Sequence, residues 1–225
     1  GTTSGTVHFE TSLGQQSVGF TRAYVHKGYD SSSNSDLALV WLSASAPVGA
    51  ERYQLYRTAD ELGKSFTLVG YGKPGTGATG TLSGYSGEPI RQKATNVFDA
   101  DVARLKWLYG TALAWNPLAG SQLAADFDSG LFVNDALWQF LGVRDSGDVQ
   151  TEGLLTSGDS GGPAFVGGLL AGVASYSSSL TLGGQFPDPD GLNNSTFGEI
   201  AAWQRVSYFQ QWIDQTVRAA YPNAP

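Results

Sequence analysis

Segments of strand length, in which apolar residues alternate with polar ones or run together, recur along most of the chain. Such patterns are typical of strands that place at least one face on a core. Clusters of Gly, Ser, Asn and Pro at 28–36, 72–80 and 186–195 separate several of these segments and predict turns or surface loops. The predicted strands are 6–11, 17–26, 36–42, 65–72, 129–135 and 162–176.

The C-terminal part of the chain has a helical pattern instead. Over residues 206–220, apolar residues recur at three- and four-residue spacing, with Gln, Asp and Arg between them. The spacing predicts one amphipathic helix, and the segment 99–110 predicts a second, shorter one. The apolar face of the C-terminal helix consists of Val206, Phe209, Ile213 and Val217.

Composition agrees with a β-rich fold and excludes several kinds of partner. The 225 residues are 41% hydrophobic and include 30 glycines, as expected of short strands joined by tight turns around a core. A net charge of −7 without a Lys/Arg cluster argues against nucleic-acid binding. The absence of cysteine excludes disulfides and thiolate metal sites, and no apolar run is long enough to span a bilayer. We therefore expect an all-β protein without a nucleic-acid or membrane partner.

The segment "TSGDSGGPAFVGG" at 156–168 has the form of a loop that presents a serine nucleophile. Its glycines permit a backbone too tight for side chains, so that the N–H groups of Gly158 and Ser160 can point at one oxygen. A serine hydroxyl still needs a base to take its proton. The identity of that base is the main question that the sequence raises.

The order of residues along the chain limits the serine enzymes that fit. The segment 158–162 also matches G-x-S-x-G of α/β-hydrolases, but those enzymes carry a histidine after the serine, and none follows Ser160 here. The subtilisin order needs an aspartate before the histidine, yet the first aspartate, Asp30, follows both His8 and His26. The order His, Asp, Ser is the one that remains.

With this order, the chain closely resembles the trypsin/chymotrypsin-like serine peptidases, in particular cysteine-free bacterial members. "GDSGGP" at 158–163 resembles the nucleophile motif of that family, and "SDLALVWL" at 35–42 resembles the entrance to the strand that carries its aspartate. "VASYSS" at 173–178 is similar to the substrate-pairing strand, and 203–213 to the final strand and terminal helix. The resemblance extends from about Val7 onward.

The resemblance implies two packed six-stranded antiparallel β-barrels followed by the C-terminal amphipathic helix. Only two or three strands precede Asp36, so the first barrel is expected to be incomplete in this chain. The implied division is 1–50 for the remainder of the first barrel, 51–205 mainly for the second barrel with its loops, and 206–225 for the helix and tail.

The resemblance also assigns roles to individual residues. Ser160 would be the nucleophile, and Gly158 and Ser160 would form the oxyanion hole. Asp36 would be the buried acid that orients an imidazole, although an aspartate at a strand entrance is commonly just a turn residue. Asp159, a charge between glycines, would need a buried cationic partner, which in the family is a freshly cleaved N-terminus.

Substrate preference would depend on a pocket whose floor, by family position, is Leu154. An apolar floor cannot neutralise Lys or Arg, so a peptide or protein substrate with a small or medium apolar side chain is expected. A different alignment around Glu152, or Leu154 as a plain core residue, is the alternative. The remaining pocket residues would be Ser175, Tyr176, Ser177 and Ala201.

Neither histidine has the sequence surroundings of the family's catalytic histidine. His8 alternates with apolar neighbours and is expected to face solvent or a neighbouring strand, and His26 lies where the family has a noncatalytic histidine. We expect the catalytic histidine on a noncovalent companion chain, released by proteolytic cleavage just before Gly1. The whole would be a secreted two-chain endopeptidase; a serine esterase, a noncatalytic pseudoprotease that binds a partner, or an inactive truncated form are the alternatives.

Two acidic segments invite comparison with metal sites. "DPDGLNN" at 188–194 is spaced somewhat like a calcium loop but lacks the twelve-residue pattern and its bidentate glutamate. "ADFDSG" at 125–130 is equally ambiguous. A polar surface turn is the simpler interpretation, so no metal or other cofactor is assigned.

Overall fold

The computed structural model describes residues 4–145, 147–148 and 150–221. The chain is mostly β, with 33% of residues in strands and 16% in helices, and its larger sheet is curled and antiparallel. This confirms the β-rich fold and the C-terminal helix. None of the helices in the described ranges is long and apolar enough to cross a membrane.

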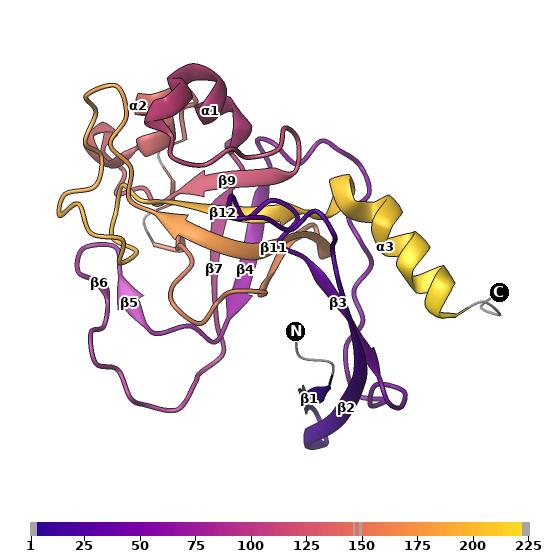
Figure 1. Cartoon of the computed structure of the whole chain (residues 1–225). Coiled ribbons are helices and arrows are strands. Elements are labelled where there is room, and N and C mark those ends of the chain that lie inside the picture. The colour runs from indigo at the N-terminus through magenta and orange to yellow at the C-terminus, as the bar shows by residue number, and fades with distance from the viewer. Residues whose placement is uncertain (1–3, 146, 149, 222–225) are drawn as a thin grey trace.

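The first sheet is a three-stranded antiparallel meander in the order β1-β2-β3, coloured indigo in Figure 1. Gly14, at φ +96°, ends the tight turn between the first two strands, a conformation that L side chains rarely adopt. All three strands lie within 1–50. Their bounds are Gly5–Thr11 for β1, Gly14–Val25 for β2 and Ala38–Leu42 for β3.

The second sheet has seven antiparallel strands in the order β7-β4-β10-β11-β12-β9-β8. Its two edge strands, β7 and β8, are consecutive in the chain with only Phe98 and Asp99 between them, so the sheet curls back toward itself (Figure 1). All seven strands lie within 51–205. The bounds are β4 Ser65–Gly70, β7 Gln92–Val97, β8 Ala100–Asp101, β9 Gln122–Asp126, β10 Pro163–Val166, β11 Leu169–Ser178 and β12 Ile200–Arg205; a separate short hairpin consists of β5 Gly75–Thr76 and β6 Gly80–Thr81.

Aromatic packing fills the inside of the curled sheet. The rings of Phe66 and Phe98 are stacked with centroids 3.9 Å apart, and the indole of Trp203 meets Phe66 edge-on at 5.0 Å. All three side chains are buried. Helices α1 (Ala103–Tyr109) and α2 (Ala136–Leu141) cover a second apolar cluster around Leu105, Leu137 and Ile200. The predicted short helix within 99–110 is therefore confirmed as α1.

The predicted C-terminal helix is confirmed as α3, Val206–Ala220. Val206 and Phe209 are buried, whereas Val217, one turn from the end, is 46% exposed, so the apolar face is used mainly in its first half. α3 packs beside the first sheet (Figure 1), where the imidazole of His26 lies 5.4 Å from the ring of Phe209 and 4.9 Å from that of Trp212. Tail residues 222–225 lie outside the described residues.

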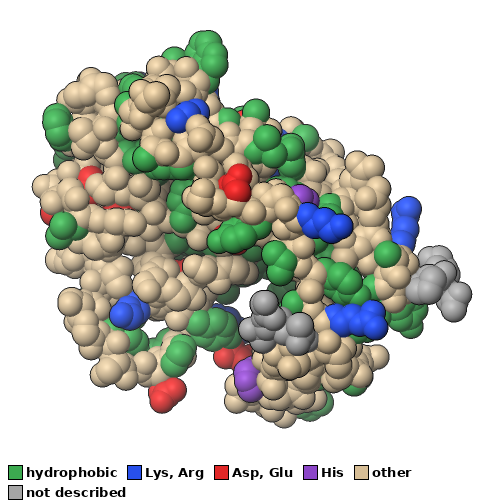
Figure 2. Space-filling view, viewed as in Figure 1, with side chains coloured by type: hydrophobic (Ala, Val, Ile, Leu, Met, Phe, Trp, Pro, Cys, Tyr) green, Lys and Arg blue, Asp and Glu red, His purple; other side chains and the backbone are tan. Residues whose placement is uncertain are grey.

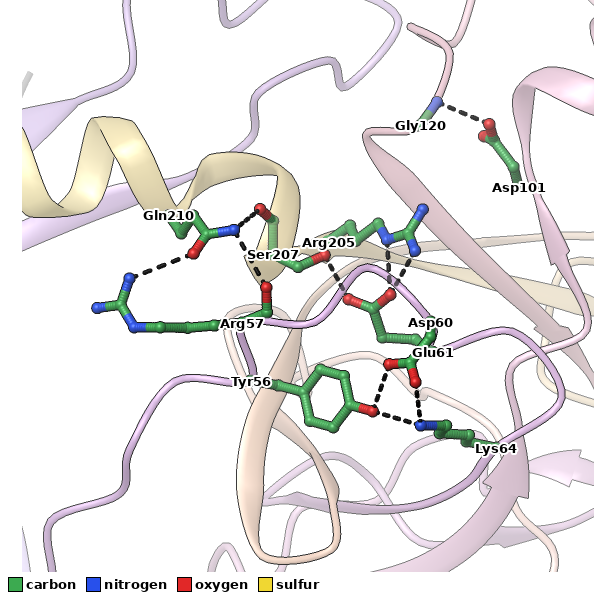
Figure 3. A network of polar contacts seen from close by, with 10 residues as sticks. All are labelled: Tyr56, Arg57, Asp60, Glu61, Lys64, Asp101, Gly120, Arg205, Ser207 and Gln210. Atoms are coloured by element: carbon green, nitrogen blue, oxygen red, sulfur yellow. Dashed lines mark hydrogen bonds and ion pairs between the residues drawn. The ribbon is translucent and has the colours of Figure 1, made fainter.

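A polar network ties the segment between the two sheets to β12 and α3 (Figure 3). The carboxylate of Glu61 is fully buried and accepts hydrogen bonds from Arg205 Nε at 2.9 Å and from the hydroxyl of Ser207. Nearby, the guanidinium of Arg57 forms a bidentate pair with Asp214 on α3, with both N–O distances 2.9 Å. The buried carboxylate of Glu61 is paired with Arg205 and Ser207, as a buried charge requires.

Two strand predictions are wrong in detail. The segment 129–135 forms a short 3-10 turn (η2, Phe132–Asn134) instead of a strand, because the carboxylate of Asp135 accepts a hydrogen bond from the N–H of Trp138 at 2.8 Å and caps α2. The segment 162–176 is a hairpin rather than one strand. Gly167 and Gly168, at φ +56° and +81°, make the turn between β10 and β11.

Candidate functional site

Ser160 lies on a tight loop immediately before β10. Gly158 and Gly161 flank it at φ +107° and +82°, a region that favours glycine, which accounts for their presence. The loop is held by two backbone hydrogen bonds: the N–H of Asp159 donates to Thr156 O at 3.0 Å, and the N–H of Gly161 donates to Ala174 O at 2.8 Å. The serine is exposed on a well-anchored backbone.

The amide groups of this loop suit an anionic oxygen. Within the described ranges, neither the N–H of Gly158 nor that of Ser160 donates a hydrogen bond to another residue. A Cβ on Gly158 would stand 3.2 Å from Gly72 Cα, so the loop backbone packs closely against the segment after β4. Two free N–H groups beside a serine hydroxyl are the donors that an oxyanion hole needs.

Asp159 is held by neutral donors. Its carboxylate accepts hydrogen bonds from the N–H of Gly72 at 2.7 Å, from the N–H of Thr156 at 2.8 Å and from the hydroxyl of Thr156 at 3.1 Å. The predicted cationic partner is not found among the described residues, and these donors can satisfy a half-buried carboxylate without one. Gly1 itself lies outside the described residues.

Asp36 stands just before β3 and reaches across to the second sheet. Its Oδ2 accepts a hydrogen bond of 2.7 Å from the hydroxyl of Ser175 on β11. The loop that carries it is fixed by Asn34, whose amide donates to Asn116 O at 2.8 Å and accepts from the N–H of Leu118 at 2.6 Å. The side chain therefore bridges two sheets and is not confined to a local turn.

Ser160 lines a cavity of about 440 Å³ together with Ser175, Tyr176 and Ser177 on β11. The phenol of Tyr176 donates a hydrogen bond to Gln122 Oε1 at 2.7 Å, and burial raises the pKa of this hydroxyl, so it stays neutral. No carboxylate is among the described residues of the wall. The other lining residues are Lys73, Thr81, Leu82, Ser83, Gly84, Leu155, Thr156, Ser157, Asn193, Asn194 and Ser195.

Leu154 and Ala201 are predicted pocket residues that lie outside this cavity. Leu154 is 7% exposed and belongs to the core cluster that contains Phe66; it lines a separate cavity of about 390 Å³, and the next residue, Leu155, lines the cavity of Ser160. Ala201 is fully buried on β12 opposite Ser177. Leu155 also belongs to the core cluster and lines the cavity of about 390 Å³, so burial in this segment does not by itself identify a floor residue.

Two further cavity residues, Asn193 and Asn194, were not singled out from the sequence as pocket residues. The amide oxygen of Asn193 is 3.1 Å from the hydroxyl of Ser177, which joins the 186–195 loop to β11. The sequence shows this loop only as a polar turn. Nothing in that pattern indicates that it packs against a strand so close to Ser160.

A wider groove of about 1260 Å³ separates the first sheet from the serine loop, and Figure 2 shows this side of the molecule hollowed between the two parts. His8 and Ser160 both line it. The Nδ1 of His8 is nevertheless hydrogen-bonded across the β1–β2 pair to the hydroxyl of Ser17 at 2.7 Å, and the Nδ1 of His26 accepts from the N–H of Gly28 at 3.0 Å. Within the described residues, neither histidine is hydrogen-bonded to Ser160 or Asp36.

Comparisons with known proteins assign no family. No protein-family model matches the chain, and no curated protein matches it.

Proposed function

We propose that the chain is the larger part of a secreted serine endopeptidase with a chymotrypsin-like two-barrel arrangement, whose catalytic histidine is on a companion chain. The observation that carries the proposal is the hydrogen bond between Asp36 and Ser175. It brings a carboxylate from the first sheet to the strand that lines the cavity of Ser160. A Ser-His-Asp site assembled between two β units needs such a carboxylate.

In the proposed reaction, the hydroxyl oxygen of Ser160 attacks the carbonyl carbon of a peptide while an imidazole takes the hydroxyl proton. The N–H groups of Gly158 and Ser160 stabilise the oxyanion of the tetrahedral intermediate. The C–N bond breaks, the imidazole returns the proton to the leaving amine, and an ester to Ser160 remains. Water then hydrolyses the ester by the same proton transfers, and Asp36 orients the imidazole and stabilises its charged form.

Support for a companion chain comes from the first sheet. Across the described ranges, the outer edges of β1 and β3 have no strand partner. Unpaired edges offer N–H and C=O groups to another chain, and added strands would complete a barrel. In the absence of cysteine such a companion binds by strand pairing and packing alone.

The cavity supports an uncharged substrate side chain. Its wall carries hydroxyl and amide groups with Leu82 and Leu155, and its one charged lining residue among those described is Lys73. A lysine or arginine side chain would find no counter-charge there and would be repelled by Lys73. We expect a small or medium, uncharged side chain before the scissile bond.

Covalent labelling with a fluorophosphonate tests the proposal at the serine. The preparation is the complete assembly, that is, the 225-residue chain with its companion. Wild type should be labelled on Ser160 and should cleave peptides, whereas Ser160→Ala should lose the label and nearly all turnover, because only the residual effect of binding and oxyanion stabilisation remains. Ser45→Ala, at an exposed serine outside this cavity, is the control and should keep both.

Other outcomes distinguish the alternatives. Labelling with turnover of esters but not peptides favours a serine esterase. A folded assembly that resists labelling favours a noncatalytic binding protein. Wild-type turnover in the Ser160→Ala variant contradicts the proposed chemistry altogether.

A further inference from the structure

Five carboxylates gather at one end of the second sheet. They come from the junction of β7 and β8, the end of β9, the turn before α2 and the segment that precedes Leu154. Four of them are at least nine-tenths buried, and Glu152 is half-buried. The group, called here the acidic cluster, consists of Asp99, Asp126, Asp128, Asp135 and Glu152.

The centre of the acidic cluster has the spacing of a cation site. Asp126, Asp128 and Asp135 each contribute one carboxylate oxygen, and these oxygens all lie within 4.8 Å of one another. The three residues are 1%, 2% and 2% exposed. A single ion can contact oxygens at that separation, because Ca²⁺ binds its ligands at about 2.3–2.6 Å.

The hydrogen bonds of the cluster leave one oxygen of several carboxylates unused. Asp135 accepts the N–H of Trp138 with Oδ1, and Glu152 accepts the N–H of Asp128 with Oε1 at 2.7 Å. Asp126 accepts the N–H of Leu137 with Oδ2, also at 2.7 Å. The buried atoms Asp128 Oδ1, Asp135 Oδ2 and Glu152 Oε2 have no hydrogen-bond partner among the described residues. Buried acceptors without partners are rare in native proteins and call for a ligand or proton.

The pKa values of the cluster also indicate that its carboxylates need neutralisation. Burial and the neighbouring carboxylates raise the pKa of Asp126 and of Asp128, and burial, with nearby aspartates, raises the pKa of Glu152 to about 7. No ion pair within the described ranges involves the cluster. Uncompensated charges this close are unfavourable unless protons or a cation neutralise them.

We propose that Asp126, Asp128 and Asp135 bind a calcium ion, with Glu152 beside them. Oxygen-only donors favour Ca²⁺ or Mg²⁺ over Zn²⁺ and copper, which prefer nitrogen or sulfur ligands. Mg²⁺ usually keeps several of its waters, whereas Ca²⁺ accepts six to eight protein oxygens in flexible geometry, which suits a buried cluster of carboxylates. The site is separate from the 188–194 loop and does not depend on the proposed peptidase function.

Calcium in the acidic cluster would connect the end of β9 to the start of α2. It would also fix Asp128, whose N–H holds the carboxylate of Glu152. The chain from Glu152 continues through Leu155, which lines the cavity of Ser160. The ion would thereby fix the segment that leads into the serine loop.

Thermal unfolding and terbium luminescence test the proposal on the full chain. After chelation with EGTA, calcium should raise the Tm of wild type by roughly 5–10 °C at about a hundredfold excess over Kd. Tb³⁺ is a luminescent calcium analogue. Its emission should be sensitised by Trp138, whose backbone N–H donates a hydrogen bond to Asp135. Asp128→Asn should abolish both effects, yet in EGTA it should have a higher Tm than wild type, since a neutral amide at this buried position needs neither a proton nor a cation.

The control is Asp190→Asn, which alters the exposed 188–194 loop and should leave calcium binding unchanged. Asp135→Asn, which keeps a side chain able to cap α2, is a second test variant should Asp128→Asn fail to fold. Loss of calcium binding in Asp190→Asn but not in Asp128→Asn would place the ion in the other loop. Wild type that folds and binds no calcium at millimolar concentration would leave protons as the means of neutralisation and overturn the proposal.

Discussion

Asp36 and Ser175 make the contact on which the proposed chemistry depends. The hydrogen bond of 2.7 Å joins residues that are far apart in the chain and lie in different sheets. Gln204 supports it from β12, since its amide donates to the same hydroxyl at 3.3 Å. The aspartate is thus held on one side while its remaining oxygen is available to an imidazole.

Asp36→Asn should lower kcat of the complete assembly by about four orders of magnitude, as loss of the orienting carboxylate does in serine peptidases. The amide can still accept the hydrogen bond from Ser175, so the fold and Tm should change little. Steady-state peptide kinetics and thermal unfolding check this. Ser31→Ala, at an exposed position in the same loop, is the control and should keep wild-type kcat; an equal loss there would mean that the loop, rather than the carboxylate, matters.

Single residues differ in how far the sequence could determine their place. The loop around Ser160 could be predicted because the positive φ angles of Gly158 and Gly161 admit few other residues. The contact of His8 with the neighbouring strand could be predicted from the alternation of polar and apolar residues in 6–11. Leu154 could not be placed, because tertiary packing decides which buried residues also line a cavity. Leu154 and Leu155 both belong to the core, but of the two only Leu155 lines the cavity of Ser160.

At the scale of elements, strands with a buried face were predictable from their alternation, and so was α3 from its helical spacing. The segment 129–135 was not, because its apolar run is interrupted by a side-chain cap that favours the start of α2 over a strand. The sequence drew attention to Asp126 and Asp128 but did not assign a metal to them, because it does not show their partners. The members of the acidic cluster are scattered from Asp99 to Glu152, and only the curling of the sheet brings them together.

The acidic cluster should make the stability of the calcium-free chain depend on pH. Its carboxyl groups have a raised pKa in the folded protein, so between about pH 4 and pH 8 the folded state holds protons that the unfolded chain has released. The calcium-free chain should therefore lose stability as pH rises through this window. Denaturant unfolding in EGTA at pH 5 and pH 8 measures the loss, and Asp128→Asn should reduce it. An equal pH dependence in the variant would contradict this origin.

The whole molecule consists of a curled seven-stranded sheet and a smaller sheet that α3 and the segment 51–64 hold beside it (Figure 1). A β-rich fold of this kind could be predicted from composition and pattern. The relative position of the sheets could not, because it depends on a few specific contacts between distant residues. The hydrogen bond between Asp36 and Ser175 is one of these.

For the whole molecule, we predict that the 225-residue chain purified by itself has no peptidase activity, because within the described residues neither His8 nor His26 is hydrogen-bonded to Ser160 or Asp36. Activity should copurify with a second polypeptide, detectable by mass spectrometry, that contains a histidine. Hydrogen exchange should show β1 and β3 protected in the active preparation and less so in the isolated chain. Full activity from the purified chain with no companion detected would contradict the two-chain arrangement.

The open edges of β1 and β3 have a kinetic consequence. If a partner completes the site by pairing with these edges and no covalent bond holds it, the active species forms by a bimolecular equilibrium. Its amount then rises with the square of the total concentration when both chains are dilute and equimolar. Dilution by itself would switch such an enzyme off reversibly, so hydrolysis would be confined to places where both chains accumulate.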